Sequence, residues 1–238
     1  MSCYESLAAF YDRLTEDVDY RQFADRYEQA FSGDGGEFRL LLDLCCGTGS
    51  LSLEMSRRGY EMIAVDGSES MLMQAREKCA VLPVPPLFLL QDAGELDLYG
   101  TVDAAFCSLE GINYLSPDTL DRLLGRLYLF IRPGGLFLFD LRTPAYLESL
   151  DGDTFVDEDE EVFCLWRADF DAELPALVYG MDLFSREGRL WRRSREEHIE
   201  YAHSLSFLST LLNEHGFTDL VAEEQNDRLH IRCRRSEK

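Results

Sequence analysis

Short apolar runs alternate with segments of helical periodicity through the middle of this 238-residue chain. Such runs suit strands that are buried on both faces, and the segments between them space their apolar residues three or four positions apart. This alternation predicts a parallel sheet whose helical crossovers cover both of its faces. The strands expected in the sheet are residues 40–42, 61–65, 87–90, 102–107 and 136–141, followed near the end by 220–223 and 229–233. The fold class is therefore α/β, with a Rossmann-like sheet of seven mostly parallel strands.

Signals for helix ends accompany these strands. Ser68 is a good N-cap, and in Ser116-Pro117 a cap precedes a proline at the first helical turn, where proline is favoured. Gly216 ends a last helix that is expected over residues 204–215. Apolar residues at helical spacing over residues 4–31 predict two short helices before the sheet.

The pattern changes after the fifth expected strand. An acidic run over residues 151–161 suits a solvated loop, and the extended runs that follow it contain no helical signal. Glu187-Gly188, between the last two runs, is typical of a hairpin turn. The extended runs are residues 163–170, 177–185 and 190–198. We predict an antiparallel insertion over residues 143–202, carried by a core of residues 1–142 and 203–238 with an N-terminal helical cap.

The net charge of the chain limits the kinds of partner that it can bind. It carries 23 Lys and Arg against 45 Asp and Glu, a formal net charge of −22, and its sequence pI is about 4.4. Such a field repels phosphate backbones, so DNA, bulk RNA and anionic membrane surfaces are not expected partners. Two groups of arginines are interpreted as the solvated faces of edge strands. They are Arg192, Arg193 and Arg195, and Arg228, Arg232, Arg234 and Arg235.

The seven cysteines form no CxxC pair and no Cys/His cluster at zinc spacing. They are therefore expected to be reduced, and no metal site is expected. The first residues form no apolar run of the signal type, and no stretch approaches the roughly 20 apolar residues that a membrane-spanning helix needs. These features predict a cytoplasmic protein.

A glycine bend links the first expected strand to the helix after it. Gly47-Thr48-Gly49 breaks the apolar run, and glycine lets a ligand approach the backbone closely. Asp66 follows the second strand, seventeen positions after Gly49, where a carboxylate can accept both hydroxyls of a ribose. Because the carboxyl ends of parallel strands meet at one edge of a sheet, the bend and the acid predict a nucleoside site there.

The residues around the bend favour a cationic nucleoside. In a dinucleotide fingerprint a third glycine would stand at the position of Ser52. Asp43, four residues before Gly47, suits a cationic ligand better than a pyrophosphate. The sulfonium and ammonium groups of S-adenosylmethionine therefore fit better than a nicotinamide cofactor. Asp92, after the third strand, can accept from an adenine amino group, and Ala93 offers a backbone amide to the ring.

Together these segments resemble the successive motifs of class I S-adenosylmethionine-dependent methyltransferases. The motifs are residues 43–49, Val65-Asp66, Gln91-Asp92-Ala93, 103–115 and Arg132-Pro133-Gly134-Gly135. Phe10-Tyr11-Asp12 and Asn113-Tyr114-Leu115 are similar to a largely uncharacterised bacterial group of small methyltransferases, which carry an antiparallel lid between the fifth strand and the last helix. Glu110-Gly111-Ile112 departs from that group, which often has an acid followed by a serine or similar small residue there.

The resemblance implies where the cofactor lies. Gly47 and Gly49 would line its methionine portion, and Asp66 would hold its ribose. Tyr11 would cap it from the N-terminal helices. For Tyr11 and Met71, a place in the core is the alternative. The residues expected around S-adenosylmethionine are Tyr11, Asp43, Cys45, Gly47, Thr48, Gly49, Asp66, Gly67, Ser68, Met71, Asp92, Ala93 and Ser108.

Methyl transfer from a sulfonium is an in-line displacement, so the enzyme gains rate by aligning the nucleophile with the methyl group in a dry pocket. A base is needed only where the nucleophile arrives protonated. His198, on the lid strand that leads into the last helix, is the candidate base, with a structural histidine as the alternative. Asn113 and Tyr114 could orient an acceptor, and Glu110 could attract a cationic amine.

The expected function is N- or O-methylation of a small molecule by a monomer or homodimer. Three alternatives stay open on the sequence alone. They are a protein that binds S-adenosylmethionine or its product without chemistry, a nicotinamide-dependent enzyme, and a methyltransferase that acts on protein or tRNA. The net charge weighs only modestly against tRNA, because a partner protein could supply a positive surface.

Overall fold

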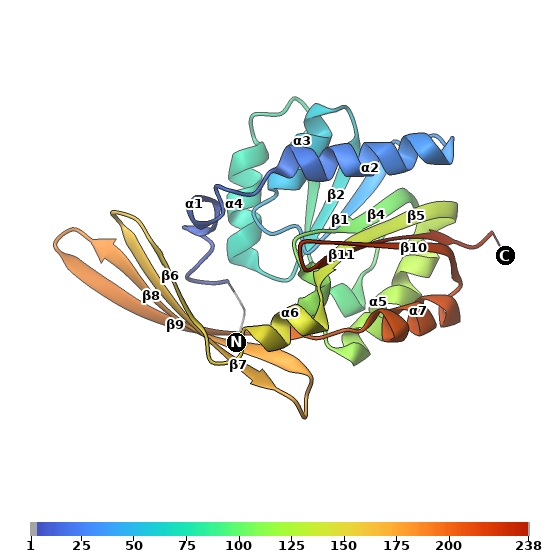
Figure 1. Cartoon of the computed structure of the whole chain (residues 1–238). Helices are drawn as coiled ribbons and strands as arrows, with labels where there is room; N and C mark the ends of the chain where they lie inside the picture. The colour runs from blue at the N-terminus through green and yellow to red at the C-terminus, as the bar shows by residue number, and fades with distance from the viewer. Residues whose placement is uncertain (1–3, 238) are drawn as a thin grey trace.

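The predicted apolar runs form one seven-stranded sheet. The computed structural model describes residues 4–237, and Figure 1 shows this sheet between two layers of helices. Its strands are β1 (Leu40–Leu44), β2 (Glu61–Asp66), β3 (Leu87–Leu90), β4 (Val102–Cys107), β5 (Ile131–Arg142), β10 (Phe217–Gln225) and β11 (Arg228–Arg235). Their order is β10-β11-β5-β4-β1-β2-β3; β11 runs antiparallel to both β10 and β5, and the other pairs are parallel. The predicted mostly parallel Rossmann-like sheet is confirmed.

Helices cover both faces of this sheet, because successive residues of a strand point to opposite sides. Leu41 packs in the core of one face, and Leu42 packs in the core of the other. The first face is covered by α2 (Tyr20–Asp34), α3 (Ser50–Arg57) and α4 (Glu69–Cys79), and the second by α5 (Pro117–Phe130) and α7 (Leu205–Glu214) (Figure 1). Within residues 4–237, no helix is long and apolar enough to span a bilayer.

The predicted helix ends form as expected. The hydroxyl of Ser68 accepts a hydrogen bond from the backbone amide of Met71, and that of Ser116 accepts one from Thr119. Gly216 has a φ of 80°, in the left-handed region where glycine is favoured after a helix. Ser68 and Ser116 begin the helices that follow the parallel strands β2 and β4, so these two turns lie at the carboxyl edge of the sheet.

A second, antiparallel sheet extends from the core between β5 and α7 (Figure 1). We call this sheet the lid sheet. Its strands are β6 (Thr154–Glu158), β7 (Val162–Asp171), β8 (Ala176–Glu187) and β9 (Leu190–Tyr201), paired in that order. The turn expected at Glu187-Gly188 joins β8 to β9, and Gly188 has a φ of 65°. The predicted antiparallel insertion is therefore present.

Two expectations for this insertion are wrong. Part of the acidic run forms strand β6 rather than a loop, because it pairs with β7 at the edge of the lid sheet, where its five exposed residues leave the acids in solvent. A helix also forms where none was expected, α6 (Pro144–Ser149), which buries Leu147 against the lid sheet. Thr143-Pro144 is the same cap-and-proline signal as Ser116-Pro117, and it could have identified this helix.

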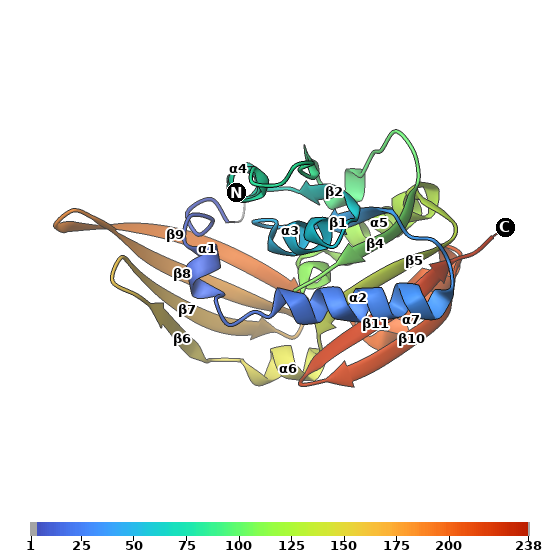
Figure 2. The ribbon, with the colours of Figure 1, turned by 90° about the horizontal axis from the view of Figure 1, so that it is seen from above.

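The N-terminal segment packs on the lid sheet rather than on the core. Leu7 is buried against Val162 and Met181, and the side chains of α1 (Tyr11–Leu14) lie at the edge of the same cluster. Glu196 of β9 accepts the backbone amides of Tyr4 and Ser6. Figure 2 shows α1 lying over the strands of the lid sheet, between them and α2. The segment thus closes one side of the space between the lid sheet and the core.

Candidate functional site

A cavity of about 380 Å³ opens at the carboxyl ends of the parallel strands. We call it the first cavity. Of the thirteen residues expected around the cofactor, twelve line its wall. They are Tyr11, Asp43, Cys45, Gly47, Thr48, Asp66, Gly67, Ser68, Met71, Asp92, Ala93 and Ser108. The exception is Gly49, which begins α3 with a φ of 72°, and whose added Cβ would lie 2.9 Å from the Cβ of Ala75 in α4. Gly49 therefore allows two helices to approach and does not line the cavity.

Asp66 ties the glycine bend to the end of β2. Its Oδ2 accepts the amide of Gly47 at 2.8 Å, and its Oδ1 accepts the amide of Ser68 at 2.8 Å. Burial raises the pKa of Asp66, while hydrogen bonds from the backbone of Ser68, Gly47 and Gly67 oppose that rise. Each carboxylate oxygen keeps a further lone pair. The arrangement suits a vicinal diol such as that of a ribose, and open space beside Gly47 leaves room for it.

Asp43 is the acid deepest in the first cavity, with 2% of its surface exposed. The hydroxyl of Ser52, at the position where a dinucleotide site would have glycine, donates to its Oδ2 at 2.5 Å. Burial raises the pKa of Asp43 to about 7, opposed by the hydrogen bond from Ser52 and assisted by the negative charge of Asp66. Because a nearby cation would favour the ionised form, this carboxyl suits the cationic end of S-adenosylmethionine.

Affinity for S-adenosylmethionine should weaken as the pH falls below 7, because protonated Asp43 no longer attracts the cation. The ionised fraction drops about tenfold for each pH unit below the pKa, so we expect the Kd to rise several-fold between pH 8 and pH 6. S-adenosylhomocysteine, which lacks the sulfonium charge, should show a smaller dependence. Calorimetric titration of both ligands at pH 6, 7 and 8 measures the effect. Equal pH dependence in the Asp43→Asn variant would contradict it.

The stability of the free protein depends on pH in the opposite direction. The folded state raises the pKa of Asp43 from 3.8 to about 7, so folding favours the protonated carboxyl. This contribution to the free energy of unfolding is fully present below pH 4 and is lost as the pH rises toward 7. Ligand binding and stability of the free protein therefore respond to Asp43 in opposite directions.

The adenine end of the first cavity follows β3. Asp92 caps the short 3-10 helix η1 (Ala93–Glu95), where its Oδ1 accepts the amide of Gly94 at 2.8 Å. Its other oxygen has no hydrogen bond among the described residues, so it is free to accept from an amino group. Met71 and Leu115 supply apolar surface nearby. A flat heterocycle with an exocyclic amine fits these neighbours.

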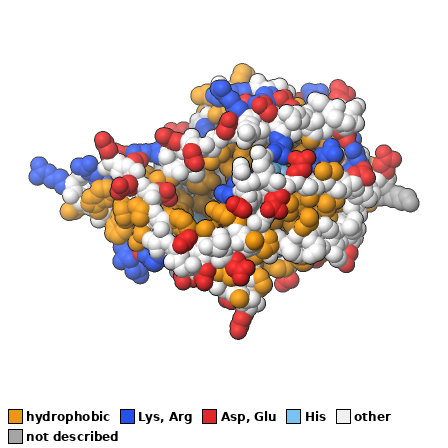
Figure 3. All heavy atoms as spheres, viewed as in Figure 1, with side chains coloured by type: hydrophobic (Ala, Val, Ile, Leu, Met, Phe, Trp, Pro, Cys, Tyr) orange, Lys and Arg blue, Asp and Glu red, His pale blue; other side chains and the backbone are white. Residues whose placement is uncertain are grey.

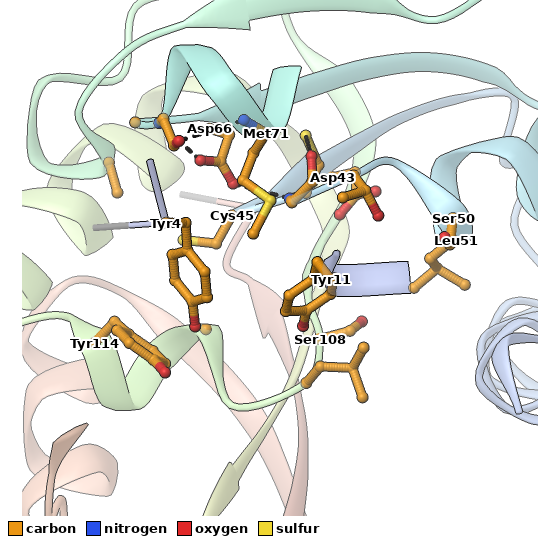
Figure 4. A pocket seen from close by; sticks show the side chains of 18 of the residues that line it. Tyr4, Tyr11, Asp43, Cys45, Ser50, Leu51, Asp66, Met71, Ser108 and Tyr114 are labelled. Carbon is orange, nitrogen blue, oxygen red and sulfur yellow. Dashed lines mark hydrogen bonds between the residues drawn. The ribbon is translucent and has the colours of Figure 1, made fainter. Parts of the chain in front are cut away.

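Three tyrosines form the wall opposite the acids. Figure 4 shows Tyr4, Tyr11 and Tyr114 on one side of the cavity, and Asp43 and Asp66 on the other. The ring centroid of Tyr4 lies 5.8 Å from that of Tyr11 and 5.7 Å from that of Tyr114. Burial raises the pKa of all three, so their hydroxyls remain protonated donors. Tyr4 was not expected here, because it reaches the site only through the packing of the N-terminal segment on the lid sheet.

A second cavity of about 200 Å³ adjoins the first at these tyrosines and is lined by residues of both the lid sheet and the core. We call it the second cavity. It shares Tyr4, Tyr11, Leu109 and Tyr114 with the first, and its remaining wall consists of Leu7, Leu14, Thr15, Glu110, Asp157, Trp166 and Glu200. Figure 3 shows a hollow between the lid sheet and the core with hydrophobic side chains inside and acids around it. Three carboxyl groups and no Lys or Arg line the second cavity, which favours a cationic guest.

Glu110 is held on this wall by a buried ion network. Asp140, with 1% of its surface exposed, accepts the amides of Leu109 at 3.0 Å and Glu110 at 3.3 Å, two residues with left-handed backbone. Arg228 forms ion pairs with both Asp140 and Glu110, and Arg142 lies 2.8 Å from Glu110. Only 14% of the Arg228 side chain is exposed, so its interpretation as part of a solvated strand face is wrong.

The four residues expected to act on the acceptor do not all reach it. Tyr114 lines both cavities and Glu110 lines the second. Asn113 is fully buried in the 3-10 helix η2 (Gly111–Tyr114), where its Oδ1 accepts the amide of Arg142 and its Nδ2 donates to the carbonyl of Tyr201. Asn113 therefore fastens this loop to both ends of the lid insertion and does not face an acceptor.

His198 also lies away from both cavity walls. It is 0% exposed, and Tyr4, Tyr114 and Trp166 surround its ring at centroid distances of 4.7, 6.1 and 5.5 Å. Its Nε2 is 3.3 Å from Oε2 of Glu196, but neither ring nitrogen has an aligned hydrogen bond. This placement favours the alternative of a structural histidine, because the ring is fully buried and lines neither cavity.

Comparison with known proteins agrees with this geometry. The methyltransferase domain family matches residues 41–135. The putative methyltransferase YqeM of Bacillus subtilis (strain 168) is 27% identical, over 98% of this chain and 97% of that protein. A crystal structure of an S-adenosylmethionine-dependent methyltransferase from Clostridium acetobutylicum ATCC 824 is 27% identical and superposes with a TM-score of 0.85, covering 99% of this chain and 100% of that one.

A more distant structure shares the same fold. The sugar N-methyltransferase KedS8 from Streptoalloteichus sp ATCC 53650 superposes with a TM-score of 0.80, covering 98% of this chain and 94% of that one, at 21% identity. The matches favour a methyltransferase over a nicotinamide-dependent enzyme. The methyltransferase domain at residues 41–135, the similarity to methyltransferases along the whole chain and the residues around the first cavity together support a class I S-adenosylmethionine-dependent methyltransferase.

Proposed function

We propose that the enzyme methylates the nitrogen of a small molecule that binds in the second cavity as a cation. The observation that carries this proposal is the composition of that wall, which combines Glu110, Asp157 and Glu200 with aromatic side chains and has no Lys or Arg. Acids and aromatic faces both attract a protonated amine. A neutral hydroxyl compound gains less binding free energy from the same side chains.

The position of the second cavity supports the same proposal. It shares Tyr4, Tyr11 and Tyr114 with the first cavity, so a guest there lies beside the space for the methyl donor. S-adenosylmethionine supplies a methyl group on a sulfonium, which is a good leaving group. The residues of the second cavity then have to hold the acceptor nitrogen in line and exclude water, for which a narrow space between two sheets is suited.

The size of the second cavity argues for a small acceptor. A volume of about 200 Å³ accommodates a compound the size of a monosaccharide rather than a folded partner. The sugar N-methyltransferase KedS8 has this fold, which is consistent with a small acceptor that carries a nitrogen. The net charge of −22 further favours a cationic acceptor over tRNA.

A panel of matched compounds tests the acceptor class. Each set contains a primary amine, its hydroxyl counterpart and its N-acetyl derivative, and transfer of a labelled methyl group from S-adenosylmethionine is measured. We expect turnover of amines, at least tenfold lower turnover of the hydroxyl compounds and none of the acetylated ones. Bulk tRNA serves as the negative control. Preferential turnover of the hydroxyl compounds, or of tRNA, would contradict the proposal.

A further inference from the structure

We infer that Glu200 is the general base of the reaction, accepting a proton from the ammonium group of the acceptor in the second cavity. This inference rests on the proposed amine acceptor and assigns a residue to the step that such an acceptor requires. An ammonium has no lone pair, so it cannot attack the methyl group until one proton has left. The base must therefore touch the nitrogen inside the second cavity.

Glu200 is positioned for the role that was expected of His198. Both residues lie on β9, two positions apart, so their side chains leave the same face of the lid sheet. The ring of His198 is enclosed by aromatic neighbours, whereas the carboxyl of Glu200 forms part of the second cavity wall. With 9% of its surface exposed, Glu200 reaches the cavity and remains shielded from bulk water.

The other two acids of the wall are already engaged. Glu110 forms ion pairs with Arg142 and Arg228. Asp157 lies on the exposed edge strand β6 and accepts the indole N–H of Trp166 at 3.0 Å. Among residues 4–237, no Lys, Arg or His nitrogen lies within 4 Å of the Glu200 carboxylate. Glu200 is thus the buried acid of this wall that can take up a proton without breaking an ion pair.

The surroundings of Glu200 favour its protonated form near neutral pH. Burial raises its pKa to about 7, and the charge of Glu110 adds to that rise, while the hydroxyl of Tyr114 and the two nearby guanidinium groups oppose it. A base with a pKa close to the working pH both accepts and releases a proton readily. The titratable and charged groups that face Glu200 are Tyr4, Glu110, Tyr114, Arg142, Tyr179 and Arg228.

An aliphatic amine enters the cavity as an ammonium, because its pKa lies well above 7. Glu200 takes one proton, and the lone pair that this frees on nitrogen forms a bond to the methyl carbon. The bond from that carbon to sulfur breaks with its electron pair on sulfur, which leaves neutral S-adenosylhomocysteine and a methylated ammonium. Glu200 then passes its proton to solvent, so each turnover releases one proton.

The first test needs no acceptor. Protein labelled at the glutamate carboxyl carbon is saturated with S-adenosylhomocysteine and titrated by NMR from pH 4 to pH 9. We expect one glutamate signal to titrate near pH 7, to disappear in Glu200→Gln and to persist in Glu197→Gln, an exposed residue of the same strand. Glu200→Asp removes the same labelled signal and serves if the Gln variant does not fold. If no signal titrates above pH 6, or if that signal survives in both Glu200 variants, the inference is overturned.

The second test uses the best amine of the panel. At pH 7.5 Glu200→Gln should lower kcat at least 100-fold, abolish the rise of kcat with pH near 7 and change the KM for S-adenosylmethionine less than twofold. Glu197→Gln should stay within twofold of the wild type. An aromatic amine, which is unprotonated at this pH, should lose far less in Glu200→Gln. If Glu200→Gln lowers kcat equally for both amines, or leaves kcat unchanged, Glu200 is not the base, although the acceptor is still an amine. If only hydroxyl compounds are methylated, the proposed function itself is wrong.

Discussion

Replacing Asp66 by Asn should weaken the binding of S-adenosylhomocysteine by at least 100-fold. Asp66 joins the glycine bend to β2 through the amides of Gly47 and Ser68 and keeps lone pairs for a ribose diol. The neutral amide removes two charge-assisted hydrogen bonds to the ligand, each worth about 1.5 to 3 kcal/mol, and turns an N–H group toward a backbone N–H. Calorimetry gives the Kd directly.

A thermal shift assay provides the matching readout. At a ligand concentration of 100 times the wild-type Kd, S-adenosylhomocysteine should stabilise the wild type by about 2.7 kcal/mol and the Asp66→Asn variant by less than about 0.5 kcal/mol. Asp97→Asn, an exposed acid outside the first cavity, is the control and should behave as the wild type. If Asp66→Asn binds as tightly as that control, the assignment of the ribose position is wrong.

Replacing Arg228 by Met should destabilise the protein by about 3 kcal/mol, a fall in Tm of about 6 to 12 °C for a chain of this size. The cause is the burial of Asp140, which would lose the guanidinium that offsets the cost of its charge. Burial raises the pKa of Asp140 and Arg228 opposes that rise, so in the variant Asp140 should take up a proton more readily. The loss should therefore shrink as the pH falls.

Two further variants test whether the loss of stability comes from the buried ion pair or only from the removal of an arginine. Arg232→Met, on the same strand without an ion pair in the described structure, should change the free energy of unfolding by less than about 0.5 kcal/mol. Combining Arg228→Met with Asp140→Asn should recover about half of the loss, since the buried charge is gone while one amide acceptor is kept. Urea unfolding at pH 7 measures all of them. Equal stability of the Arg228 and Arg232 variants would contradict the role of the network.

The sheet and the first cavity could be predicted because both depend on local patterns. Apolar runs determined the strands, and Ser68 and Ser116 determined helix starts through hydrogen bonds within three residues. Parallel strands end at a common edge, so Asp43 and Asp66 had to converge there whatever the packing of the helices. The positions of these acids at the ends of the strands were therefore sufficient to predict that they lie close together in the fold.

The second cavity could not be predicted in the same way, because contacts between distant segments create it. Tyr4 reaches the wall only because the N-terminal segment packs on the lid sheet, and no motif marks it. His198 was expected to act from the strand that leads to the last helix, but which side chain of that strand meets the second cavity depends on the neighbouring rings. Arg228 was misread for a similar reason, since its partner Asp140 lies 88 positions earlier.

The hydrogen bonds of Asn113 join the two ends of the lid insertion to the core. Its amide binds the backbone at Arg142 and at Tyr201, where the inserted chain leaves and rejoins the core. These two junctions lie together, so the segment between them is joined to the core at a single place. Exchange of that segment would change the lid side of the second cavity, while Asp43, Asp66 and Asp92 would keep their positions in the core around the methyl donor.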